Sequence, residues 1–259
     1  MTDTLAIEAQ QLSAAYHRKP VLNNISLTLP AGQWTAIVGP NGAGKSSLLK
    51  VVTGTLRPLH GELRIFGASA GQQRRAGKIA YMPQHEQMEW DFPVSVQETV
   101  MTGRYGLMRH DAWWQRLLPQ RWANPMHRHA VEEALDAVDM REHATRPIGE
   151  LSGGQKKRVM LARALAQQAE ILLLDEPLAG VDPPSERLIL AMLERERRAG
   201  RSIVMVTHDL PSARCHADQV VLINHTLVGI GPPGEMLSDA MLAQLAVGGS
   251  PSGGLHVAA

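Results

Sequence analysis

The chain has 259 residues, of which 44% are hydrophobic, with 26 Lys and Arg against 25 Asp and Glu. This size suits one large domain or two small ones with a buried core, and a net charge of +1 argues against a nucleic-acid partner. The single Cys215 excludes a disulfide framework, and short apolar runs without a signal-peptide pattern in residues 1–11 predict a soluble, intracellular protein.

The first third of the chain is predicted to form short β-strands. Pro, Gly and Asn turn signals separate the β-rich runs at residues 5–9, 25–29, 35–38, 62–66 and 78–81. From about Val96 the pattern becomes helical, and apolar residues between Ala130 and Val138 recur at helical spacing.

Helices and buried strands alternate in the second half. A helix is predicted from Ser152 to about Gln168, a strand at 171–174, a helix over 185–198 and a strand at 202–206. This alternation predicts an α/β fold with a mainly parallel sheet. Residues 248–259 begin with a linker-like composition, which predicts a disordered tail.

A phosphate-binding loop is predicted after the strand at 35–38. The segment matches the pattern G-x-x-x-x-G-K-[ST] and consists of Gly39, Pro40, Asn41, Gly42, Ala43, Gly44, Lys45 and Ser46. Backbone N–H groups and a helix N-terminus would surround a polyphosphate, Lys45 would reach its outer phosphates, and Ser46 would ligate Mg²⁺. The alternative is a glycine-rich turn that matches by chance, but the strand before it and the helical run after it favour phosphate binding.

Two acidic residues end the buried strand at 171–174. Because ligands bind at the carboxyl edge of open α/β sheets, Asp175 is placed to hold Mg²⁺ and Glu176 to orient or polarise a water. The alternative is that Asp175 and Glu176 simply end a core strand. A phosphate-binding loop in the same chain makes that interpretation weaker.

The segment Leu151 to Gln155 separates the classes of P-loop protein. Ser152 and Gln155 fit a capping box at the start of a helix. Such a box does not explain Gly153 and Gly154, because glycine is unfavourable in a helix. Exposed glycines there would let a phosphate approach the backbone, which suggests a second phosphate site that serves another subunit's nucleotide.

With these motifs in this order, residues 5 to 245 resemble the ABC-type ATPases. The resemblance implies a single ATPase domain over 1–247, with an antiparallel β subdomain and an inserted helical subdomain at about 95–165. It also implies that two copies pair head-to-tail, so that ATP lies between the P-loop of one and residues 152–155 of the other. ATP and Mg²⁺ are the implied cofactors.

The resemblance assigns roles to four further residues. Tyr16 is similar to the aromatic residue that stacks on adenine, although a core tyrosine is the alternative. Gln84 resembles the glutamine that contacts Mg²⁺ and water and senses the membrane partner, and Asp182 resembles the loop aspartate at the dimer interface. His208 is similar to the histidine that contacts the γ-phosphate. Ser47 stands where the family more often has Thr, and it keeps the hydroxyl.

Within the family, residues 90–96 and 103–106 resemble importer ATPases for manganese, zinc and iron. That resemblance implies a peripheral protein on the cytoplasmic face of the membrane. Its partners would be two integral membrane permease subunits and, indirectly, an extracytoplasmic metal-binding protein. Siderophore or haem importers, and a soluble ABC ATPase without a transport role, are the alternatives.

The sequence departs from this group in one segment, and its paired histidines raise the separate question of a metal site. The segment 107–128 is long and carries Trp113, Trp114 and Trp122, which could contact the permease or simply cap the helical subdomain. His127 and His129 do not share a helix face and have no cysteine nearby, so we expect them to be surface histidines rather than metal ligands.

Overall fold

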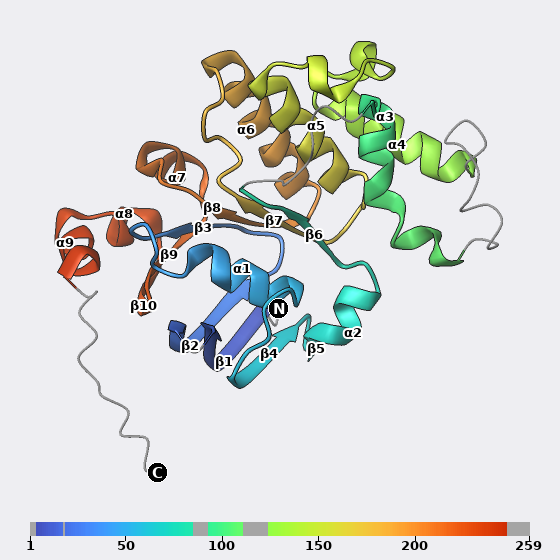
Figure 1. The fold of residues 1–259 in the computed structure, drawn as a ribbon. Coiled ribbons are helices and arrows are strands. Elements are labelled where there is room, and N and C mark those ends of the chain that lie inside the picture. The colour runs from blue at the N-terminus through green and yellow to red at the C-terminus, as the bar shows by residue number, and fades with distance from the viewer. Residues whose placement is uncertain (1–3, 18, 85–92, 111–123, 248–259) are drawn as a thin grey trace.

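A central six-stranded sheet organises the protein, whose computed structural model describes residues 4–17, 19–84, 93–110 and 124–247 (Figure 1). The strand order is β10-β9-β3-β8-β7-β6, and only β10 runs antiparallel to its neighbour. The bounds are β3 (Trp34–Val38), β6 (Ile79–Met82), β7 (Ile171–Asp175), β8 (Ser202–Val206), β9 (Gln219–Asn224) and β10 (Thr226–Gly231). Every residue of β3, β7 and β8 is buried, as expected for parallel strands covered on both faces.

A second, antiparallel sheet has the order β2-β1-β4-β5. Its strands are β1 (Leu5–Tyr16), β2 (Lys19–Pro30), β4 (His60–Ile65) and β5 (Ala68–Ser69). Strands β1 and β2 are longer than predicted, because register shifts carry their pairing through the polar stretches around Gln11 and Asn24. Helix α1 (Lys45–Thr53) lies between the two sheets and shares one apolar core with both of them (Figure 1).

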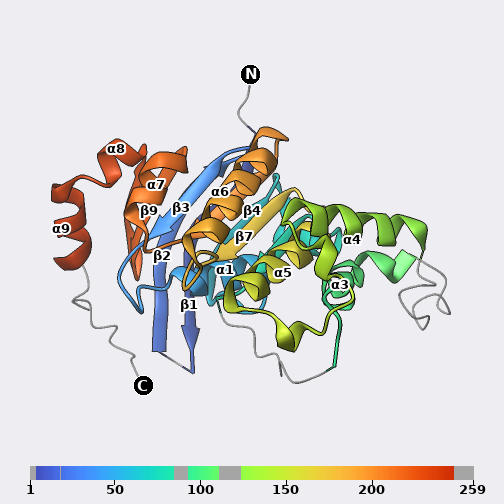
Figure 2. The same cartoon turned by 90° about the horizontal axis from the view of Figure 1, so that it is seen from above.

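A helical layer covers the opposite face of the six-stranded sheet (Figure 2). Helices α3 (Val96–Met101), α4 (Pro125–Ala137) and α5 (Gly153–Leu165) pack on one another, and α5 also contacts α6 (Pro183–Arg198). The smaller helices are α2 (Ala70–Arg75), α7 (Leu210–His216), α8 (Pro233–Met236) and α9 (Asp239–Val247), with 3₁₀ turns at Thr102–Arg104, Leu107–His110, Arg141–His143 and Ile148–Glu150.

This arrangement confirms the predicted α/β class with a mainly parallel core sheet. The single domain over 1–247 with an inserted helical subdomain at about 95–165 stays our interpretation. The predicted tail at 248–259 lies outside the described residues, as do residues 90–92, Trp113, Trp114 and Trp122. In the described part of the chain, none of the helices combines the length and the apolar character needed to span a bilayer.

The prediction of two surface histidines was wrong for His127. Its ring is only 1% exposed, and its Nδ1 accepts a hydrogen bond of 3.1 Å from the Nε of Arg104, itself 2% exposed. Because α4 begins at Pro125, His127 falls on the same helix face as the buried Ala130 and Val131. His129 is exposed as predicted, and its Nε2 lies 3.2 Å from the carboxylate of Glu133.

Candidate nucleotide site

Four adjacent strands end at one edge of the central sheet, and predicted site residues follow each of them there. The loop 39–44 follows β3 and Glu176 follows β7 directly. His208 lies two residues after β8, and Gln84 lies two residues after β6. Parallel pairing places the carboxyl ends of these strands together, so residues far apart in sequence converge.

The phosphate-binding loop is fixed by close backbone contacts. A Cβ at Gly39 would lie 2.1 Å from the carbonyl oxygen of Ile223. Gly44 has φ +95°, and a Cβ there would lie 2.5 Å from the carbonyl oxygen of Val21. Larger residues would therefore displace the loop. The side chain of Lys45 folds back over it and donates hydrogen bonds to the carbonyl oxygens of Gly39 (2.8 Å) and Pro40 (2.9 Å). Burial lowers the pKa of Lys45, while the nearby Glu176 and Asp175 oppose that shift.

Asp175 and Ser46 form an oxygen-rich pair beside the loop. The Ser46 hydroxyl donates a 3.0 Å hydrogen bond to one carboxylate oxygen of Asp175, and the Tyr81 hydroxyl lies 3.5 Å from the other. Burial raises the pKa of Asp175, and the hydrogen bond from Ser46 opposes this. Hydroxyl and carboxylate oxygens are the ligands that Mg²⁺ prefers, and Mg²⁺ is usually held by few protein groups together with substrate phosphates. These two side chains therefore fit a Mg²⁺ ion that arrives with a nucleotide.

Both carboxylate oxygens of Glu176 are bound by side chains from neighbouring strands. The amide Nε2 of Gln84 donates to one oxygen at 2.7 Å, and the Nε2 of His208 lies 2.8 Å from the other. The backbone of Glu176 has φ +51°, a left-handed conformation that is uncommon for a residue with a side chain. Its N–H donates to the carbonyl of Val206 on β8, which fixes the direction in which the carboxylate leaves β7.

Residues 152–155 begin α5 as a capping box, as predicted. The Ser152 hydroxyl accepts from the N–H of Gln155, and the Gln155 amide oxygen accepts from the N–H of Ser152. Gly153 is exposed and has open space around it, but the expectation that Gly154 is exposed was wrong. A Cβ at Gly154 would lie 2.5 Å from the Oδ1 of Asp182, so this glycine admits the loop before α6.

Asp182 and Tyr16 lie outside the group around Glu176. The carboxylate of Asp182 accepts from the N–H of Ser185 and caps α6, and its pKa is lowered by that bond. Tyr16 ends β1 and is 39% exposed, with the ammonium of Lys50 5.7 Å from its ring centroid. This exposure excludes the alternative of a core tyrosine. Ser47 lies half-buried on α1, and its predicted role stays a prediction.

Two residues that bear on the site were missed in the sequence. Tyr81 contacts Asp175, and burial raises its pKa above the usual value. Lys157 donates a 3.1 Å hydrogen bond from its Nζ to the backbone carbonyl of Glu176. Helical spacing offered one signal for Lys157, because it lies four residues after Gly153 on the same face of α5.

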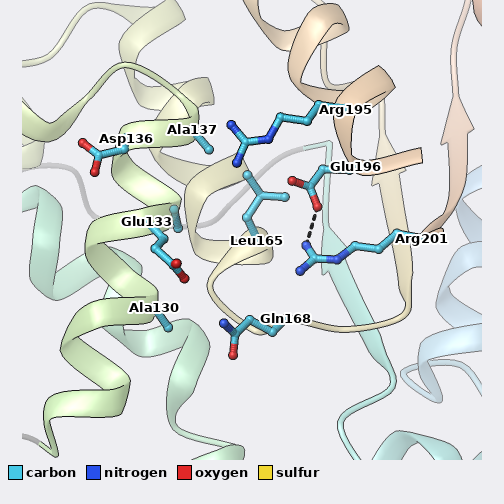
Figure 3. A pocket seen from close by; sticks show the side chains of 10 residues that line it. Ala130, Glu133, Asp136, Ala137, Leu165, Gln168, Arg195, Glu196 and Arg201 are labelled. Carbon is cyan, nitrogen blue, oxygen red and sulfur yellow. Dashed lines mark ion pairs between the residues drawn. The ribbon is translucent and has the colours of Figure 1, made fainter. Parts of the chain in front are cut away.

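A cavity of about 380 Å³ lies away from this site, between α4 and the end of α6 (Figure 3). The Glu133 side chain points into it from α4, and Arg195 and Arg201 line the opposite wall; Asp136 lies at its margin with its carboxylate turned away. All its lining residues lie outside the predicted site, so this hollow is separate from the nucleotide chemistry.

Comparisons with known proteins agree with the geometry. The chain is 40% identical over 217 residues to the manganese transport system ATP-binding protein MntB of Bacillus subtilis, which covers 83% of this chain and 81% of the relative. It is also 40% identical over 215 residues to the zinc transport system ATP-binding protein TroB of Treponema pallidum, covering 83% and 77% of the two chains. In fold it is similar to a putative metal-chelate type ABC transporter in an inward-facing conformation, with a TM-score of 0.77, 24% identity and coverage of 94% and 89%. The family model for ABC transporters matches residues 22–179. The chain therefore belongs to the ABC transporter family.

Proposed function

We propose that this chain is the ATP-binding and ATP-hydrolysing subunit of an importer for a divalent transition-metal ion. The observation that carries the enzymatic part is the Glu176 carboxylate, held by Gln84 and His208 at the sheet edge that bears the phosphate-binding loop. A carboxylate fixed at both oxygens beside a phosphate site is suited to orient an attacking water.

Binding of ATP would engage a lysine that now forms its hydrogen bonds within the loop. Lys45 would exchange its bonds to the carbonyls of Gly39 and Pro40 for bonds to the outer phosphates. The exposed ring of Tyr16 would stack on the adenine. Ser46 and Asp175 would hold Mg²⁺, with Gln84 as a further oxygen ligand; the bound ion would neutralise charge on the phosphates.

Hydrolysis would then depend on the three side chains around Glu176. Glu176 would position and polarise the water, and His208 would donate a hydrogen bond to the γ-phosphate. Gln84 sits where a shift of the segment after β6 would change its bond to Glu176, so it would report the state of the membrane partner to the site.

Two copies of the chain would complete each other's sites. The start of α5, with exposed Ser152 and Gly153, would bind the phosphates of ATP held by a second copy, and Asp182 would lie at the interface between the copies. We further propose attachment to two permease subunits at the cytoplasmic face of the membrane, supplied by an extracytoplasmic metal-binding protein.

The similarity to these relatives supports a divalent metal ion as the cargo, but it does not favour manganese over zinc. The relatives named for manganese and for zinc are equally similar, at 40% identity. Uptake of radiolabelled manganese, zinc and iron into cells that lack this chain identifies the cargo. Loss of uptake for one ion, with restoration by the wild-type chain, is the expected result, and unchanged uptake of all three would contradict it.

The enzymatic proposal is tested by Glu176→Gln. This change keeps the bulk of the side chain and removes the negative charge, so we expect ATP affinity within about threefold of wild type and turnover lowered by at least about 100-fold. Glu170→Gln is the matched control, because Glu170 lies at the opposite edge of the sheet in an exposed ion pair with Lys78. Turnover by Glu176→Gln at the wild-type rate would remove Glu176 from its role.

A further inference from the structure

Lys157 connects α5 to the glutamate that follows β7. Its side chain is half-buried, and its Nζ donates to the backbone carbonyl oxygen of Glu176 at 3.1 Å. Burial lowers the pKa of Lys157, and the charges of Glu176 and Asp175 oppose that shift. This lysine therefore joins α5 directly to the backbone of Glu176.

The backbone of Glu176, which Lys157 contacts, has an unfavourable conformation. A left-handed conformation such as that of Glu176, with φ +51°, is unfavourable for a residue with a Cβ. Such a conformation persists where the surroundings determine it. Three bonds do so here: the N–H of Glu176 donates to Val206, and its carbonyl accepts from both the N–H of Ala179 and Lys157.

The same helix carries residues 152–155 at its start. Lys157 lies two residues after Gln155, and Gly154 packs against Asp182 in the loop that follows Glu176. The first two turns of α5 thus contact both ends of the segment 176–182.

We propose that Lys157 is a positioning residue that holds Glu176 of its own chain in the hydrolytic conformation and links it to the helix that serves the partner's ATP. The proposal rests on the function proposed above. It predicts that Lys157 acts on turnover rather than on ATP binding, because it contacts the carbonyl of Glu176 and none of the groups assigned to the phosphates.

The first test compares Lys157→Met, Lys157→Arg and Lys78→Met in the full-length chain. Lys157→Met removes the donor and the charge, and we expect kcat to fall about 10-fold or more while the ATP dissociation constant changes less than about threefold. Lys157→Arg keeps a charged donor and should recover most of the turnover. Lys78→Met, a lysine removed from the far edge of the sheet, should leave both values unchanged. Unchanged kcat in Lys157→Met, or a parallel loss of ATP binding and thermal stability that arginine does not rescue, would overturn the proposal.

A mixed dimer shows on which site Lys157 acts. Chains with Glu176→Gln, alone or together with Lys157→Met, are each paired with wild-type chains and purified through two different affinity tags. If Lys157 serves only its own Glu176, the second change adds nothing, because that site is already inactive, and the two mixed dimers turn over equally. A further loss in the double variant would mean that Lys157 acts on the partner's ATP and would overturn the assignment. Wild-type chains that do not hydrolyse ATP would instead contradict the proposed function itself.

Discussion

Gly153 and Gly154 are adjacent on α5 and differ in what surrounds them. A Cβ at Gly153 would meet open space, whereas at Gly154 it would lie 2.5 Å from the Oδ1 of Asp182. The other oxygen of Asp182 is held by the N–H of Ser185, so this short side chain has little freedom to withdraw. The two glycines therefore serve different purposes: Gly153 leaves the surface of the segment open, and Gly154 admits the neighbouring loop.

This difference predicts opposite effects of alanine at the two positions. Alanine is favoured over glycine within a helix by about 1 kcal/mol, so Gly153→Ala should raise the free energy of unfolding by up to that amount. Gly154→Ala should lower it by about 1 kcal/mol, because the added methyl group displaces Asp182 and breaks the cap of α6. Urea denaturation of both variants without nucleotide measures the difference between their free energies of unfolding. Equal stabilities would contradict the role of Gly154 in admitting the neighbouring loop.

At the scale of elements, the end of α6 is tied to the sheet by charged groups. Glu194 accepts hydrogen bonds from Arg197 and Arg198, and Arg197 also contacts Asp218, whose carboxylate accepts from the N–H of Trp34 on β3. The bonds from Arg197 and then Arg198 lower the pKa of Glu194 from 4.5 to about 2. The ionised form of Glu194 is therefore favoured by folding.

The stability that Glu194 contributes should depend on pH. Because its pKa is lowered in the folded state, the contribution is fully present above about pH 4.5 and is lost as the pH falls towards 2. The side chain is 23% exposed, so we expect Glu194→Gln to cost only about 0.5–1 kcal/mol at pH 7. Unfolding by urea between pH 7 and pH 3 should show the two proteins converging as the pH falls, and a constant difference would mean that ionisation of Glu194 is not the cause.

The sequence predicts best those features that depend on neighbouring residues, and it predicts poorly those that depend on contacts between distant parts of the chain. The strand at 202–206 was predicted to the residue, because a short β-branched run is flanked by Gly200 and by polar residues. The conformation of Glu176 has no local signal, since its φ of +51° depends on Val206 and Lys157, which are distant in sequence. The burial of His127 could have been predicted, because it lies three and four residues before Ala130 and Val131 on one apolar face.

For the whole molecule, the proposed nucleotide site extends beyond the sheet edge. The loop 39–46, Asp175, Glu176, Gln84 and His208 converge through strand ends, and hydrogen bonds join the acids to their neighbours. Residues 152–155 lie at the start of α5. Ser152 and Gly153 are exposed there, and the capping box holds their backbone. A phosphate bound at Lys45 of one chain would meet this exposed segment when a second copy approaches in a head-to-tail arrangement, as in a two-fold dimer.

If two copies share each site in this way, mixing two inactive variants should restore ATP hydrolysis. Lys45→Met should abolish phosphate binding in its own loop, and Gly153→Asp should repel phosphate from the start of α5. The aspartate fits the open space and the positive end of the helix, so the fold is preserved. Each variant alone should be inactive. In an equal mixture half of the dimers are mixed, and each mixed dimer has one intact site, so turnover should return to about a quarter of wild type. An ATPase assay after mixing measures this recovery, and a mixture that stays inactive while dimers form would show that residues 152–155 act within their own chain.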